Sequence, residues 1–140
     1  MILDSSAILA VLLREPSHRA VVSAMAEADL LAVGTATLAE TGLVLTSRVG
    51  PESVEILARF VADFDVVVVP FEAQHWPMAV EAFVRFGKGR HPAALNFGDC
   101  LTYATARLSS EPLLCLGGDF RQTDVVVITL ETGESPDDPS

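Results

Sequence analysis

Short aliphatic runs alternate with longer segments of helical periodicity along this chain. The aliphatic runs lack polar alternation, which is typical of strands buried on both faces of a parallel sheet. We expect strands at residues 1–4, 30–34, 66–69, 113–116 and 125–130. The periodic segments predict helices at residues 6–13, 17–28, 36–48, 51–64, 72–86 and 97–108. The order predicts an α/β domain with a mostly parallel central sheet of about five strands, flanked by helices.

Two connections interrupt this pattern. Gly50 followed by Pro51 indicates the end of one helix and the start of the next, so these two helices are expected to form a hairpin. The segment 86–96 is the longest connection without a clear period. It carries most of a basic cluster formed by Arg85, Lys88, Arg90 and His91.

The chain has 140 residues, half of them apolar and a fifth charged, which excludes a disordered chain and predicts one domain. We assign residues 1–130 to this domain. Residues 131–140 are acidic, contain Gly, Ser and Pro, and are expected to form a frayed tail.

No apolar run approaches the length of a membrane helix, and the opening Met1-Ile2-Leu3-Asp4 lacks the basic start of a signal peptide. We therefore expect a cytoplasmic protein without a membrane partner. Cys100 and Cys115 are too few for a disulfide framework and are interpreted as buried thiols.

The formal net charge of −10 argues against a general nucleic-acid binder. A local site is still compatible with this total, because the basic cluster concentrates positive charge in one short segment. Positive mean hydropathy also indicates apolar helix surface that a second copy or another protein could cover. The helices on either side of Gly50-Pro51 and the first two helices are the surfaces we expect for this.

Four carboxylates occupy positions that a solvated surface does not readily explain. Asp4 ends the first strand, Asp99 lies in the first turn of a helix, and Asp119 follows a strand in a glycine-rich turn. Glu40 lies on a helix three or four residues from Ala36, Thr37, Leu43 and Val44. Each has an ordinary explanation by itself: helix cap, dipole partner, turn residue or edge of an apolar face.

Together these positions favour a cation site. The carboxyl ends of parallel strands and the following helix starts open on one edge of the sheet, where Asp4, Asp99 and Asp119 are all expected. Converging carboxylates need a cation, and oxygen ligands favour Mg²⁺ or Mn²⁺ over zinc. The three histidines are scattered. The pattern predicts metal-dependent phosphoryl transfer or phosphodiester hydrolysis.

The chain resembles the VapC-type PIN-domain ribonucleases, toxins of bacterial toxin–antitoxin pairs, up to about residue 130. The matching segments begin with residues 1–7, which read MILDSSA, and 36–41, which read ATLAET. They continue with residues 87–100, GKGRHPAALNFGDC, and 117–124, GGDFRQTD. The third segment is highly specific.

The resemblance implies a PIN fold and a Mg²⁺- or Mn²⁺-dependent endoribonuclease that forms a homodimer and is inhibited by a VapB-type antitoxin. It implies Asp4 and Asp99 as the principal metal ligands, with Glu40 and Asp119 completing the acidic group. Ser6 is expected to orient Asp4, water or phosphate.

We interpret Arg85, Lys88 and Arg90 as a positive surface for the RNA backbone. One departure from the family pattern concerns a second metal position. Many relatives have two adjacent acids before the phenylalanine, whereas Gly118 stands in the first of these positions here. Asp124 is the alternative acid.

A different class of function also fits the acids: a non-catalytic PIN-like module that binds Mg²⁺ to organise a partner surface. A receiver domain fits poorly because its paired early acids and late lysine are missing. A small-molecule phosphatase lacks both a glycine-rich phosphate loop and an Asp-x-Asp pair.

Overall fold

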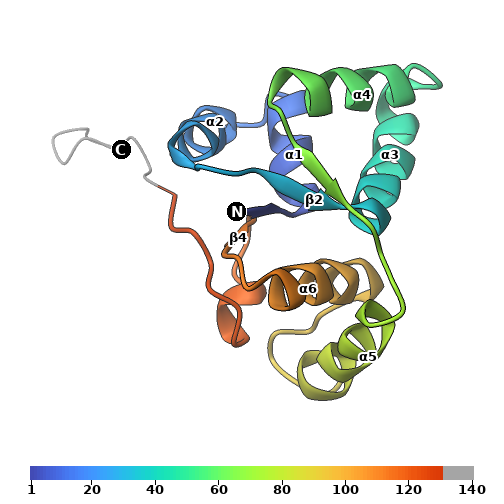
Figure 1. Ribbon diagram of the computed structural model, residues 1–140, viewed down its shortest axis with the longest axis vertical. Helices are drawn as coiled ribbons and strands as arrows, with labels where there is room; N and C mark the ends of the chain where they lie inside the picture. Colours follow the sequence, from blue (N-terminus) through green and yellow to red (C-terminus); the bar gives the residue numbers. More distant parts are fainter. Residues whose placement is uncertain (131–140) are drawn as a thin grey trace, which may run out of the picture.

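The computed structural model describes residues 1–130 and shows a parallel sheet between two layers of helices (Figure 1). The strands are β1 (Ile2–Leu3), β2 (Ala32–Gly34), β3 (Val67–Val69) and β4 (Leu113–Leu114). Their order is β3-β2-β1-β4, and every neighbouring pair is parallel. The predicted α/β fold class is confirmed.

Six α-helices connect and cover the strands within the described residues. They are α1 (Ser5–Leu12), α2 (His18–Glu27), α3 (Thr35–Val49), α4 (Ser53–Asp63), α5 (His75–Phe86) and α6 (Phe97–Ser109). All six lie where the periodicity predicts them. The predicted hairpin is also present: α3 ends at Gly50, whose φ of 85° suits glycine, and α4 begins three residues later.

The fifth predicted strand is reduced to one bridge. Val127 pairs with Leu113 in parallel, and the Leu113 N–H donates to the carbonyl of Val126 over 2.8 Å. β4 is only two residues long, so a neighbouring segment finds little backbone to pair with. Residues 1–130 therefore contain four strands. The predicted acidic tail, residues 131–140, lies outside the described residues.

Alternation along the strands divides the core into two halves. Ile2, Ala32 and Leu113 point to the layer that contains α5 and α6. The next residue of each strand belongs to the other half, with α1 to α4; these are Leu3, Val33 and Leu114. Both faces of β1, β2 and β4 are thus buried, which explains why these strands lack polar alternation, whereas the edge strand β3 exposes Val67 and Val68. Among residues 1–130, no helix combines the length and hydropathy needed to cross a membrane.

Candidate active site

Asp4 connects the end of β1 to the start of α1. Its side chain is 5% exposed, and Oδ2 accepts hydrogen bonds from the Ser6 N–H at 3.1 Å and the Ser6 hydroxyl at 2.6 Å. Its own N–H donates to the Leu114 carbonyl over 3.0 Å. Asp4 is therefore a helix N-cap and, at the same time, a fixed carboxylate at the strand ends.

Ser6 extends this anchoring to β4. While its hydroxyl proton points to Asp4, its oxygen accepts the Leu116 N–H at 2.9 Å. The hydroxyl thus bridges the Asp4 carboxylate and the backbone beyond β4. The structure confirms the predicted contact between Ser6 and Asp4, whereas the bridge to Leu116 is a tertiary contact that sequence spacing did not reveal.

Glu40 is half-buried on α3, and the face predicted around it is buried only in part, at Thr37. Leu43 and Val44 are exposed. Glu40 is instead covered by the start of α6, where a Cβ at Gly98 would overlap Glu40 Oε2. Only glycine at this position lets α6 approach the carboxylate so closely. A small residue directly before Asp99 was the available sequence signal.

Asp99 lies in the first turn of α6 and forms a capping box with Asn96. Asn96 Oδ1 accepts from the Asp99 N–H at 2.9 Å, and Asp99 Oδ2 accepts from the Asn96 N–H at 3.0 Å. The dipole-and-cap interpretation of this residue is therefore correct. It fixes the carboxylate beside Glu40 without using Oδ1, which accepts no hydrogen bond within residues 1–130.

The carboxylates act on one another electrostatically. Burial is the main reason that the pKa of Asp99 rises to about 6; the hydrogen bond from Asn96 opposes this, and the charges of Asp4, Asp119 and Glu40 add to it. Burial likewise raises the pKa of Glu40, with a further increase from Asp4. We call Asp4, Glu40, Asp99 and Asp119 the acidic edge. The structure brings all four predicted acids into one electrostatic group.

The donor chemistry of the acidic edge suits a hard cation. Both thiols are buried as predicted, and burial, followed by the charge of Asp4, raises the pKa of Cys115 to about 12. A protonated thiol is a poor metal ligand, so carboxylate oxygens are the available donors. Within residues 1–130, no group of three or more acidic, imidazole or thiol side chains is already arranged to coordinate a metal ion. Instead, Asp4 and Asp99 are engaged in cap hydrogen bonds.

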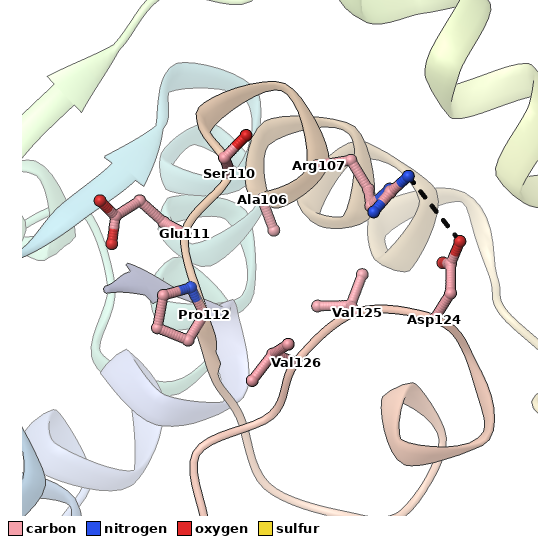
Figure 2. Close-up of a pocket in the computed structure, with 8 residues that line it drawn as sticks. All are labelled: Ala106, Arg107, Ser110, Glu111, Pro112, Asp124, Val125 and Val126. Atoms are coloured by element: carbon pink, nitrogen blue, oxygen red, sulfur yellow. Dashed lines mark ion pairs between the residues drawn. The ribbon is translucent and has the colours of Figure 1, made fainter.

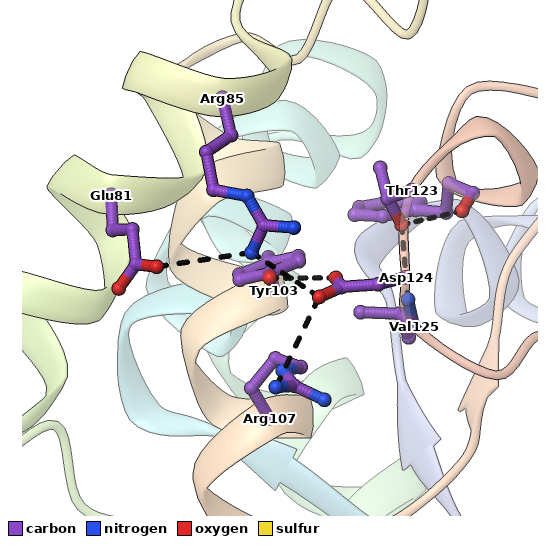
Figure 3. A network of polar contacts seen from close by, with 8 residues as sticks. Glu81, Arg85, Tyr103, Arg107, Thr123, Asp124 and Val125 are labelled. Atoms are coloured by element: carbon purple, nitrogen blue, oxygen red, sulfur yellow. Dashed lines mark hydrogen bonds and ion pairs between the residues drawn. The ribbon is translucent and has the colours of Figure 1, made fainter.

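Asp124 belongs to a different environment, shown in Figure 3. Its Oδ1 accepts from the Tyr103 hydroxyl at 2.7 Å, and its Oδ2 lies 3.3 Å from Arg85 and 3.9 Å from Arg107. Burial alone raises the pKa of Asp124, but the Tyr103 hydroxyl and the two guanidinium groups outweigh this and lower it. We call these four residues the Asp124 network. These contacts give Asp124, the alternative acid for a metal site, a structural role.

The members of the basic cluster differ in whether they form ion pairs. Arg85 is paired with Asp124 and, at 3.8 Å, with Glu81. Lys88 and Arg90 are exposed and form no ion pair within the described chain. The Arg90 guanidinium lies 5.5 Å from the centre of the Phe83 ring. Two cations thus stay available on the connection between α5 and α6.

A surface hollow of about 350 Å³ lies beside the other end of α6 (Figure 2). Its lining includes Ala106 and Ser110 from the end of α6 and Val126 from the last described segment. The Arg107–Asp124 ion pair borders it. The acidic edge is built around the first turn of the same helix, so the hollow and the carboxylates are separate features.

Comparisons with known proteins agree with this arrangement. The model of the PIN domain family matches residues 1–126. Ribonuclease VapC36 of Mycobacterium tuberculosis is 46% identical over 126 residues, which cover 89% of this chain and 91% of the relative. This level of identity extends across the whole α/β domain.

Two solved structures share the fold. The crystal structure of Mycobacterium tuberculosis VapC20, a sarcin–ricin loop cleaving toxin, superposes with a TM-score of 0.75 at 20% identity and covers 91% of this chain and 97% of that one. VapBC2 from Rickettsia felis, bound to a promoter DNA fragment, gives a TM-score of 0.73 at 14% identity and covers 93% and 98%.

Fold and sequence together show that the chain belongs to the PIN-domain family. Within that family it is a VapC ribonuclease, a phosphodiester hydrolase. The catalytic interpretation of the acids is thereby favoured over a non-catalytic module.

Proposed function

We propose that this VapC ribonuclease is a Mg²⁺-dependent endoribonuclease, also served by Mn²⁺, whose catalytic residues are Asp4, Glu40, Asp99 and Asp119. The observation that carries the proposal is that these carboxylates meet at the first turn of α6. Gly98 lies against Glu40, and the charges of Asp4, Asp119 and Glu40 add to the effect of burial on the pKa of Asp99. A divalent cation relieves this repulsion, and hard oxygen donors select Mg²⁺ or Mn²⁺.

Asp4 and Asp99 are the residues that hold the cation. Both are fixed at helix starts by cap hydrogen bonds, and both keep a carboxylate oxygen outside those bonds. Ser6 prevents the Asp4 carboxylate from rotating because it is itself held by the Leu116 N–H. When bound, the metal supplies Lewis-acid activation of water and neutralises charge developing on the phosphoryl group.

Glu40 and Asp119 are placed to orient the attacking water or to accept its proton. Burial and the charge of Asp4 raise the pKa of Glu40, which makes its carboxylate a stronger base for proton transfer. The water oxygen bonds to phosphorus as the bond to the 3′ oxygen breaks. Because Gly118 replaces a second acid and Asp124 is engaged elsewhere, one metal position is the arrangement these residues support.

Lys88 and Arg90 are the residues we assign to the RNA backbone. Their exposed cations lie on one short connection and lack ion-pair partners among residues 1–130. Arg85 contributes its charge from the Asp124 network, where its guanidinium is already paired. This local positive surface allows a chain of net charge −10 to bind a polyanion.

The partners we propose are a VapB-type antitoxin and a second copy of the chain. Homologous toxins have been crystallised in toxin–antitoxin complexes. The helical hairpin exposes Leu43 on α3 and Val54 on α4, each about three-quarters accessible. Covering such side chains is a typical function of protein partners. Residues 1–130 form the single domain that binds them, and RNA and inhibitor meet it in the cytoplasm.

RNA cleavage by the antitoxin-free protein tests the proposal. We expect cleavage with Mg²⁺ or Mn²⁺, none with chelator, and loss of activity in Asp4→Ala and Asp99→Ala variants that circular dichroism shows to be folded. Activity that survives chelation or both substitutions contradicts the assigned site. Failure of the folded, metal-supplied wild type to cut total bacterial RNA contradicts the proposed metal-dependent activity.

A further inference from the structure

Phe97 has the most exposed large apolar side chain among residues 1–130. Its ring is 79% accessible at the first position of α6 and belongs to neither hydrophobic cluster. The start of α6 is already stabilised without it, since Asn96 supplies the cap and the buried Leu95 and Cys100 occupy the two positions of a hydrophobic staple. The ring therefore has no evident role in holding the fold.

The position of this ring relative to the acids is set by helix geometry. Successive residues of an α-helix are about 100° apart, so Phe97 and Asp99 leave the helix on opposite sides of Gly98. Gly98 is the residue whose Cα faces the Glu40 carboxylate. The phenyl ring thus flanks the acidic edge on one side of Glu40, while Asp99 lies on the other.

Backbone hydrogen bonds hold a basic residue, Lys88, near the start of α6. The Lys88 N–H donates to the Leu95 carbonyl over 3.0 Å, and the Leu95 N–H donates to the Phe86 carbonyl over 2.9 Å. This pairing folds the connection between α5 and α6 back on itself. Lys88 is consequently held beside Leu95, two residues before Phe97.

We propose that Phe97 is the stacking residue for an unpaired nucleobase next to the scissile phosphate, with Lys88 contacting the adjoining backbone. This inference rests on the proposed ribonuclease function and adds a binding subsite to it. An exposed aromatic ring together with a cationic segment is the combination that binds single-stranded nucleic acid, because every base presents a π-face. A base inside a duplex has both faces covered, so the subsite selects loops and single strands.

Binding without cleavage tests the subsite directly. The probe is a fluorescently labelled, mixed-sequence RNA of about 15 nucleotides without internal pairing, measured by anisotropy with Ca²⁺ in place of Mg²⁺. The same strand annealed to its complement is the duplex control. We expect Phe97→Ala to weaken single-strand binding by about 5- to 150-fold and to leave duplex binding unchanged.

Two further substitutions separate stacking from simple apolar contact. Phe97→Trp keeps an aromatic face and should retain wild-type affinity, whereas Phe97→Leu keeps apolar area alone and should behave like Phe97→Ala. Because the ring is exposed, the thermal midpoint should be the same in all variants. Wild-type affinity in Phe97→Ala, or equal losses for single strand and duplex, overturns the proposal.

The alternative occupant of the ring is a second copy of the chain, which light scattering detects. If Phe97→Ala converts a dimer to a monomer and Phe97→Trp does not restore RNA affinity, the ring is a protein contact and the inference is wrong. Cleavage of total RNA by wild type with Mg²⁺ is measured in parallel. Wild-type cleavage with unaltered binding by Phe97→Ala rejects the subsite alone, whereas absent wild-type cleavage rejects the underlying function.

Discussion

The acidic edge and the Asp124 network place the same chemical group in opposite surroundings. At the acidic edge, burial and neighbouring carboxylates raise the pKa of Asp99 to about 6. In the Asp124 network, a phenol and two guanidinium groups lower the pKa of Asp124 despite its partial burial. Asp99 lies in α6 and Asp124 contacts the same helix, so their opposite pKa shifts come from the groups around each carboxylate.

This comparison distinguishes a binding site from a structural contact. Asp124 is satisfied within the chain: it ties the segment after the short 3-10 helix at Phe120–Gln122 to Tyr103 and Arg107 of α6 (Figure 3). Asp99 faces like charges, and the cation that we propose would compensate them. The network also fixes the chain five residues beyond Asp119, which helps to position that acid.

The largest expected effect comes from removing the charge of Asp99 while keeping its shape. Asp99→Asn retains an oxygen that can accept the Asn96 N–H, yet should lower RNA cleavage by at least about 100-fold because a metal ligand is lost. In chelator its thermal midpoint should rise by several degrees, since the cost of burying a charge and the repulsion by the other acids, together about 2 kcal/mol, disappear.

Mg²⁺ completes this test. Added Mg²⁺ should raise the thermal midpoint of wild type, because a ligand that binds only the folded state stabilises it, and should leave Asp99→Asn unchanged. Equal shifts in the two proteins contradict metal binding at the acidic edge. Differential scanning fluorimetry measures both.

The second-largest effect is expected from Gly98→Ala, which tests the importance of the close approach of α6 to Glu40. The added methyl group would overlap Glu40 Oε2 and must displace the carboxylate. We expect cleavage to fall at least about tenfold, with stability changed by less than about 1 kcal/mol because alanine favours helix. Gly118→Ala is the matched control, since nothing lies within 4 Å of its added Cβ.

Breaking the Asp124 network should mainly affect stability. Asp124→Ala removes the acceptor of the Tyr103 hydroxyl and the anion beside Arg85 and Arg107, and should reduce the free energy of unfolding by about 1 to 3 kcal/mol. Tyr103→Phe should lose about 1 kcal/mol. Urea unfolding measures both, with Asp63→Ala, an exposed acid at the end of α4, expected within about 0.5 kcal/mol of wild type.

The smallest expected effect is a pH dependence with opposite signs in the two regions. Asp99 has a raised pKa, so in chelator the unfolding free energy should fall as the pH rises from about 4 through 6, where the buried group must ionise beside Asp4, Glu40 and Asp119. Asp124 has a lowered pKa, so its contribution is present above about 4 and is lost at lower pH.

The contributions of Asp99 and Asp124 are separated by comparing wild type with Asp99→Asn. The free energy of unfolding of both proteins is measured in chelator at several pH values between about 4.5 and 7. The variant should show a flatter profile over this range. Identical profiles would show that Asp99 does not ionise against its neighbours.

Local patterns in the sequence were sufficient for most of the fold and for the four acids. Helical periodicity located all six helices, and unbroken aliphatic runs located the four strands. Burial accounts for the aliphatic runs of β1, β2 and β4, whereas Val67 and Val68 of the edge strand β3 are exposed. Asp4, Asp99 and Asp119 could be grouped because parallel strand ends share one edge. The fifth strand was overestimated, since its aliphatic pattern resembles a strand while β4 offers only two residues for pairing.

Only the tertiary structure decided how the carboxylates differ. Glu40 was associated with Leu43 and Val44, which are exposed, whereas the residue that buries it, Gly98, lies on another helix. The sequence left Asp124 as an alternative metal ligand, whereas in the structure it is bound by Tyr103, Arg85 and Arg107. Periodicity reports the burial of a residue along its own element, but the charge state of a carboxylate depends on groups distant in sequence, and those are brought together only by folding.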